Sequence, residues 1–427
     1  MRPPVERHVV AVSELDRVFA GHPVGFDLLT VDGRQFVAYY DADRRLTVAQ
    51  RSLDPDGPVG ADAGNEGPWQ RTRLPERVGW DSHNDVRLAV DAAGHLHLAG
   101  NVHVDPLVYF RSTDPLDAAT FERVGSLVGR DEDAVTYPQF LDGPDDTLVF
   151  MYRDGGSGDG RRLLDAYDPA TGEWGRLLSA PLLDGRGEMN AYPTGPVRGP
   201  EGDYHLCWVW RDTPDCATNH DLSYARSPDL RRWEQSDGHR IDLPITADTG
   251  EVVDPVPSGG GMLNRTEIGF DRQGRPILTY HKFGDAGDTQ AYNARREADG
   301  WTVVRASDWD YRWDFGGRGS IDIEIRIDPV RVIDGRLVQT FAHTEYGTGR
   351  WTLDPETLEP VETECPWHGL PRGVREAERE GLGVQWLPEG GDPTADYALR
   401  WETLPANRDR ARDATPDPGT LRVYRFE

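Results

Sequence analysis

Short apolar strands separated by turns run along the whole chain, and long amphipathic helical stretches are hard to find. A turn of the Asp/Gly type leads into an apolar strand six times, and a second strand follows each of the first five turns. The turn-led segments are 31–40, 90–97, 142–150, 199–208, 271–280 and 333–341, and the second strands are 46–51, 107–111, 163–167, 222–226 and 290–295. The clearest candidate helix is short, at residues 372–380. This pattern is typical of an all-β protein.

The repeats decide which all-β architecture is expected. Their turns follow one another at intervals of about fifty to seventy residues, a length that holds several strands, as one blade of a β-propeller does. Segments 397–402 and 421–427 could supply a further blade. We therefore predict a seven-bladed β-propeller that forms a single domain over residues 1–427. Its less regular part, about 346–427, is expected to help close the ring by pairing strands from the two chain ends. A two-domain β-sandwich is the alternative.

Composition narrows the range of partners. The chain has 427 residues and a net charge of -27, and such an acidic surface argues against nucleic acid or anionic membrane as a partner. An anionic sugar stays possible, because local Arg and His residues can reverse the field inside a pocket. Three cysteines make no disulfide framework, no window approaches a membrane span, and residues 1–8 carry charges and prolines where a signal peptide needs an apolar stretch. The chain as given is expected to be cytoplasmic, and its oligomeric state is left open.

Two histidines twenty residues apart are the strongest chemical signal. His83 and His103 flank a predicted hairpin at residues 88–98, which should bring both to one rim of a sheet. Tyr137, Arg153 and Tyr192 follow in the next repeats. Such a set suits β-elimination at a uronate, in which a guanidinium neutralises the carboxylate while His or Tyr groups remove the C5 proton and protonate the leaving O4. Each residue alone also has an ordinary structural explanation, as packing or as a brace for a turn.

Several motifs resemble the BNR-repeat-like family of carbohydrate-active propellers, over roughly residues 8–345. They are segments 35–43, 83–84, 100–103, 152–158, 190–194, 219–227 and 311–315. That family includes ulvan lyases and enzymes acting on rhamnose linked to glucuronate. The resemblance implies that Arg153 neutralises the carboxylate, that His83 and Tyr137 share the acid and base roles, and that His103 and Tyr192 orient the sugar. Asp85 departs from the family pattern, because a carboxylate there could repel a uronate or bind His83.

Three further possibilities accompany the predicted lyase. His22 resembles the single histidine of related α-L-rhamnosidases, and it would then act on the opposite face. A propeller that only binds an acidic glycan is the non-catalytic alternative. Catalysis is expected to need no cofactor, but the resemblance also implies a structural zinc, for which Cys216, His220 and His281 are the candidate ligands. Zinc prefers four such ligands, and the sequence offers three.

Overall fold

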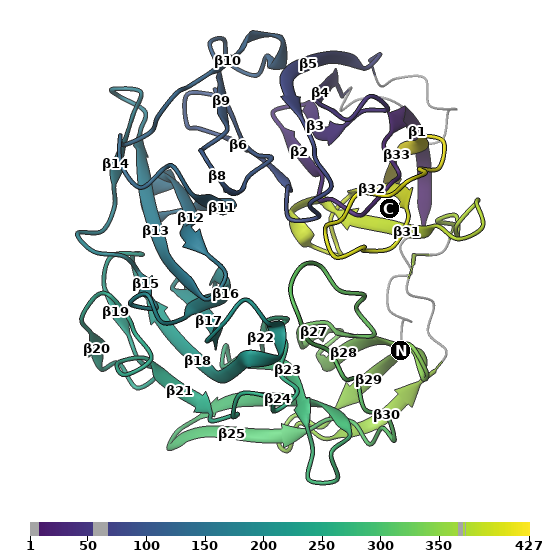
Figure 1. The fold of residues 1–427 in the computed structure, drawn as a ribbon. Coiled ribbons are helices and arrows are strands. Elements are labelled where there is room, and N and C mark those ends of the chain that lie inside the picture. Colours follow the sequence, from purple (N-terminus) through teal and green to yellow (C-terminus); the bar gives the residue numbers. More distant parts are fainter. Residues whose placement is uncertain (1–7, 54–66, 366–369, 372) are drawn as a thin grey trace.

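The computed structural model describes residues 8–53, 67–365, 370–371 and 373–427. These residues form seven sheets arranged in a ring (Figure 1). We number them by their order along the chain, with the sheet that contains both chain ends as sheet 7. The structure confirms the predicted all-β propeller, and a two-domain sandwich is not what forms.

Sheets 1 to 3 contain the first half of the chain. Sheet 1 is built from β2 (Asp27–Val31), β3 (Arg34–Tyr40), β4 (Arg45–Ser52) and β5 (Gln70–Arg77). Sheet 2 is built from β6 (Val86–Val90), β7 (Leu96–Gly100), β9 (Tyr109–Ser112) and β10 (Phe121–Arg123). Sheet 3 is built from β8 (His103–Asp105), β11 (Val135–Asp142), β12 (Leu148–Gly156), β13 (Asp159–Asp168), β14 (Glu173–Arg176) and β15 (Leu183–Asp184).

Sheets 4 to 6 repeat the same plan. Sheet 4 is built from β16 (Asn190–Arg198), β17 (Tyr204–Arg211), β18 (Asn219–Ser227), β19 (Trp233–Glu234), β20 (Arg240–Ile241) and β21 (Glu251–Asp254). Sheet 5 is built from β22 (Glu267–Phe270), β23 (Pro276–Phe283), β24 (Thr289–Glu297) and β25 (Gly300–Arg305). Sheet 6 is built from β26 (Ile325–Ile327), β27 (Arg331–Ile333), β28 (Arg336–His343), β29 (Gly347–Leu353) and β30 (Pro360–Glu364).

Sheet 7 joins the two ends of the chain. It consists of β31 (Gly383–Pro388), β32 (Tyr397–Thr403), β33 (Gly419–Phe426) and, antiparallel to β33, the N-terminal strand β1 (Val9–Val18). Residue pairs such as Val12 with Tyr424 set the register between the ends. The first strands of successive sheets lie against each other, as β2 does on β6 and β6 on β11. The start of each first strand is therefore brought to one rim of the ring.

Helix is nearly absent from the described residues, which contain only the short 3₁₀ turns η1 (Ala118–Thr120), η2 (Pro144–Asp146), η3 (Cys216–Thr218) and η4 (Glu389–Gly391). The predicted helix at 372–380 is wrong, since residues 373–380 form turns and irregular chain and residue 372 lies outside the described residues. Side chains of β32 bind the backbone there in place of helical hydrogen bonds: Arg400 donates to the carbonyl oxygen of Arg375 at 3.2 Å, and Glu402 accepts from the Glu378 N–H at 2.7 Å. Among the described residues, no helix has the length and apolar character needed to cross a bilayer.

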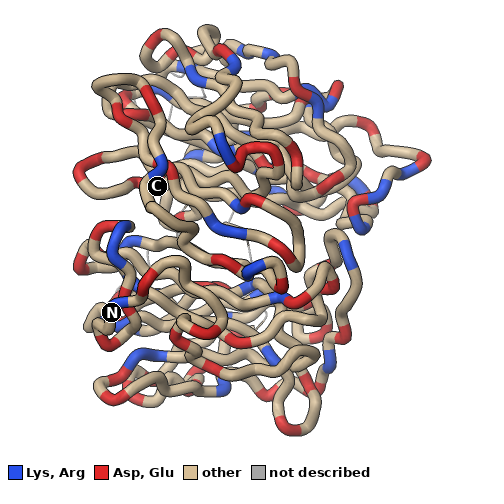
Figure 2. The backbone as a smooth tube through the Cα atoms, turned by 60° about the vertical axis from the view of Figure 1, so that its left-hand side comes forward, with Lys and Arg blue, Asp and Glu red and all other residues tan. Residues whose placement is uncertain are grey.

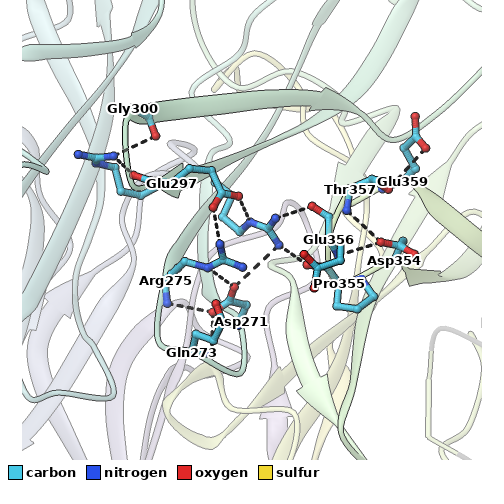
Figure 3. A network of polar contacts seen from close by, with 12 residues as sticks. Asp271, Gln273, Arg275, Glu297, Gly300, Asp354, Pro355, Glu356, Thr357 and Glu359 are labelled. Atoms are coloured by element: carbon cyan, nitrogen blue, oxygen red, sulfur yellow. Dashed lines mark hydrogen bonds and ion pairs between the residues drawn. The ribbon is translucent and has the colours of Figure 1, made fainter.

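Apolar side chains fill the space between neighbouring sheets, and Trp208, Trp210 and Trp233 of sheet 4 are fully buried there. Polar contacts also join sheets, as Figure 3 shows for sheets 5 and 6. Arg295 on β24 donates to the carbonyl oxygens of Pro355 at 2.6 Å and Glu356 at 2.7 Å, in the turn after β29. Apolar packing and polar contacts therefore both hold neighbouring sheets together.

Candidate active site

The predicted site residues gather around sheets 2, 3 and 4. His83 lies just before β6, His103 begins β8, and Tyr137 and Tyr192 lie near the starts of β11 and β16. Strand β8 pairs with β11, and this places His103 between sheets 2 and 3. Arg153 lies near the end of β12, paired with Thr136 of β11. The structure therefore brings all five residues together.

The two histidines stack and share one carboxylate. The ring centroids of His83 and His103 lie 4.3 Å apart with planes 30° apart. Asp81 accepts from Nδ1 of His83 at 2.7 Å and also from Nδ1 of His103. Burial acts to lower the pKa of His83, but the hydrogen bond and charge of Asp81 outweigh it and raise that pKa. Although burial alone would raise the pKa of Asp81, the two imidazoles hold it well below its usual range.

A second carboxylate reaches His83 from the far end of the chain. Asp409 lies in the loop between β32 and β33, with its Oδ2 atom 3.7 Å from Nδ1 of His83. Backbone N–H groups fix this carboxylate, from Ser82 at 3.1 Å and from Ser320 at 2.8 Å. The last part of the chain thus contributes to the site, which the sequence did not indicate.

Arg153 is fully buried, and no described residue forms an ion pair with it. Its guanidinium donates to Oγ1 of Thr136 and to the carbonyl oxygen of Gly155, each at 3.1 Å, while Nη1 has no partner among the described residues. The guanidinium lies 4.9 Å from the ring centroid of Tyr137 and 5.9 Å from that of Tyr192. A buried charge without an opposite charge is costly, so this arrangement favours a bound anion.

Two more arginines add to the positive charge. Arg162 on β13 is the cross-strand partner of Arg153, and burial together with Arg153 lowers its pKa to about 9. Arg211 stacks 3.9 Å from the ring centroid of Tyr192 and donates to the amide oxygens of Asn219 at 2.7 Å and Asn264 at 2.6 Å. Within the described part of the chain, none of the three arginines forms an ion pair. Elsewhere along the backbone, acidic and basic residues are interspersed (Figure 2).

Tyr137 is held in a strained backbone conformation. Its φ is 55°, a region that a bulky residue rarely enters, and it lies at an irregularity of β11 between Thr136 and Gln139. The irregularity directs the ring toward His83, at a centroid distance of 5.9 Å, and toward Tyr192, at 6.2 Å. Backbone strain of this kind is common at functional sites.

The two phenols differ in acidity. Burial and the neighbouring Tyr192 raise the pKa of Tyr137, so its hydroxyl stays protonated at neutral pH. For Tyr192 burial acts in the same direction, but the charges of Arg211 and Arg153 and a 2.6 Å hydrogen bond with Ser157 outweigh it and lower the pKa. The site therefore holds one phenol suited to donate a proton and one close to three cations.

His22 does not lie on the opposite face as expected. It precedes β2 as His83 precedes β6, and its ring packs 5.9 Å from that of Trp80, next to Asp81. The common position before a first strand puts both histidines at the same rim. His22 is only 1% exposed, with no partner for either ring nitrogen among the described residues. Burial and the charge of Arg44 lower its pKa to about 4.

The three candidate zinc ligands are not brought together. His220 binds Asp212 through Nε2 at 3.0 Å and Asp221 through Nδ1 at 2.9 Å, while Nδ1 of His281 bonds to the carbonyl oxygen of Gly261 at 3.0 Å. Cys216 is buried in an apolar cluster. In the described ranges, only Asp81, His83 and His103 place three ligand-type atoms within 4.8 Å of one another. The Nδ1 atoms of His83 and His103 both bond to the Asp81 carboxylate. In this structure the three side chains therefore form a hydrogen-bonded cluster.

Asp85 does not bind His83. It accepts from the N–H of Gly25 at 2.5 Å and pairs with Arg87 at 3.1 Å. The residues that sequence reasoning missed are Asp81, Asp409, Arg162 and Arg211. Arg162 could have been found from the sequence, because it lies as far after the turn of the β12–β13 hairpin as Arg153 lies before it.

The ring of seven sheets defines a β-propeller, with the polar group described above at its rim. The chain belongs to the BNR repeat-containing family, which it matches over residues 34–309. No curated protein matches the chain.

Solved structures with a similar fold include two lyases. The polysaccharide lyase Uly1 is 13% identical, with a TM-score of 0.62 over 98% of this chain and 99% of that chain. The PL25 ulvan lyase bound to -[GlcA(1-4)Rha3S]- is also 13% identical, with a TM-score of 0.63 over 96% of this chain and 94% of that chain. At this identity the likeness establishes the fold.

Proposed function

We propose that this protein is a polysaccharide lyase that cleaves at a glucuronate residue by β-elimination, at a rhamnose–glucuronate linkage of a plant or algal glycan. One observation carries the proposal: Arg153 is buried and, among the described residues, has no ion-pair partner and no hydrogen bond to Nη1. It lies beside the rings of Tyr137 and Tyr192, and Tyr137 in turn contacts both imidazoles. A uronate carboxylate would supply the missing negative charge. The similar fold of an ulvan lyase bound to a glucuronate–rhamnose glycan supports the same substrate class.

The elimination follows from the charges in the site. Pairing the carboxylate with Arg153 makes the neighbouring C5–H bond more acidic, because the negative charge of the intermediate is stabilised. Nε2 of His83 takes the C5 proton. The electrons of that bond form the C4–C5 double bond, the C4–O4 bond breaks, and the Tyr137 hydroxyl protonates O4. In this scheme His103 and Tyr192 orient the sugar, and no cofactor takes part.

The test is incubation of the purified protein with rhamnosyl-glucuronate glycans. A new ultraviolet absorption band from the unsaturated uronate supports elimination. Free rhamnose without that band would instead indicate an α-L-rhamnosidase, and in that case His22→Ala should abolish release. Binding of the glycan with neither product would indicate a binding protein.

Arg153→Gln tests the proposed role of the guanidinium. We expect the elimination rate to fall by about 10²–10³-fold, because an electrostatic contact to the developing charge is lost. Arg161→Gln is the matched control, since Arg161 is a partly exposed arginine on the same hairpin that pairs with Asp131 and Asp154. Full activity in Arg153→Gln would contradict the mechanism.

A further inference from the structure

Asp81 is the only carboxylate in the described structure that contacts both site histidines, one with each of its oxygens. A carboxylate has no proton to give at neutral pH, so each imidazole must donate its Nδ1–H. In a neutral ring this leaves Nε2 as the basic atom. Nε2 of both His83 and His103 is without a hydrogen-bond partner among the described residues, and both side chains are about a quarter exposed.

We propose that Asp81 is the positioning residue of this site, a carboxylate that fixes the tautomer and the stacking of both imidazoles and so presents their Nε2 atoms to the sugar. The role rests on the proposed elimination, in which Nε2 of His83 takes the C5 proton. Asp81 reaches the substrate only through the two histidines, so it is distinct from the residues that touch the sugar. It lies in the segment that enters β6, next to Trp80, whose packing against His22 and Phe19 anchors that segment.

The surroundings of His83 fix the direction of the expected pH effect. The carboxylates of Asp81, Asp409 and Asp85 act on it, and His103 and Tyr137 face its ring. Removing the charge of Asp81 takes away the nearest of these carboxylates, while Asp409 at 3.7 Å remains. Loss of this charge should therefore lower the pKa of His83, so that its Nε2 atom is available as a base at lower pH.

Asp81→Asn is the decisive variant, because an amide offers one acceptor oxygen where the carboxylate offers two. One imidazole must lose its bond or change tautomer. We expect kcat to fall on the order of 10²-fold with KM little changed, because a displaced base loses much of its contribution. The acid limb of the kcat/KM profile should move to lower pH. Asp81→Glu keeps both acceptors and should recover part of kcat, and Asp133→Asn, at an exposed carboxylate ahead of β11, should behave as the wild type.

Nitrogen NMR of the imidazole rings in the unliganded protein gives a readout that needs no substrate. At a pH above the acid limb of the profile, where the rings are neutral, the wild type should show two histidines with Nδ1–H and unprotonated Nε2, and Asp81→Asn should lose this state in one of them. If the wild type lacks elimination activity, the proposed function fails and these spectra alone decide the role of Asp81. Unchanged ring resonances, or an unchanged pH profile in an active and folded Asp81→Asn, would overturn the role. If Asp81→Asn does not fold, Asp81→Glu is measured in the same way. Wild-type ring resonances that show no Nδ1–H would also overturn the proposed role of Asp81.

Discussion

His22 is a buried histidine that should make the protein sensitive to acid. Its pKa is about 4 in the folded state against 6.5 for the ordinary side chain, so the unfolded chain binds more protons below pH 6.5. The stabilisation that comes from keeping His22 neutral is therefore complete above pH 6.5 and is lost as the pH falls toward 4.

His22→Leu should remove this contribution. The free energy of unfolding should fall in both proteins when the pH is lowered from 7 to 4.5. We expect this fall to be smaller in His22→Leu than in the wild type, by about 2 kcal/mol. Denaturant titrations at the two pH values measure the difference. His239→Leu, at an exposed histidine in the turn before β20, is the control and should keep the wild-type drop. An equal drop in wild type and His22→Leu would show that His22 is not protonated on unfolding.

At the scale of the element, the β12–β13 hairpin places two buried like charges side by side. Arg153 and Arg162 are cross-strand partners without an ion pair in the described structure, and like charges in this position destabilise a sheet. The two arginines therefore lower the free energy of unfolding while they place positive charge at the rim.

Arg162→Met should recover some of that stability. We expect the free energy of unfolding to rise by roughly 1 kcal/mol or more, because an apolar side chain of similar length needs no counter-ion. Thermal melts with and without sodium sulfate give a second measure. Sulfate that binds the arginines should raise the Tm of the wild type more than that of the variant, with sodium chloride of equal ionic strength as the control. A lower Tm for Arg162→Met in both salts would contradict the expectation.

The strands of the hairpins were predictable because each repeat places an apolar strand directly after a turn, as it does after Asp32–Gly33 and Asp334–Gly335. The rim location of His83 and His103 followed from the hairpin between them. Asp81 could not be singled out, since the chain carries 74 acidic residues and its importance comes from the two imidazoles that bond to it. Asp409 could not be predicted either, because its contact with His83 joins residues that are far apart in the sequence. The same holds for the irregularity of β11 that turns Tyr137 toward the site.

At the scale of the whole molecule, the pairing of β1 with β33 joins residues more than four hundred positions apart. A covalent link at this junction would close almost the entire chain. Ala11 and Arg425 are register partners whose side chains are only partly buried, which makes them suitable for a disulfide.

Ala11→Cys with Arg425→Cys should stabilise the protein by roughly 2–4 kcal/mol when oxidised, because the cross-link restricts the unfolded chain. The exposed Cys365 is replaced by serine to avoid mispairing. Thermal melts of the oxidised form against the same protein after reduction measure the effect, so each sample is its own control. Equal Tm values for the two forms would mean that the junction does not limit unfolding.

The contact between Asp409 and His83 also has a consequence for synthesis. The second carboxylate of the site comes from the loop before the last strand, and β33 must then pair with the first strand to complete sheet 7. A ribosome-bound chain that still lacks its final segment holds both histidines, both tyrosines and Arg153 without this support. Synthesis of the first six sheets is therefore not enough to complete the site, which needs sheet 7 to close on the first strand.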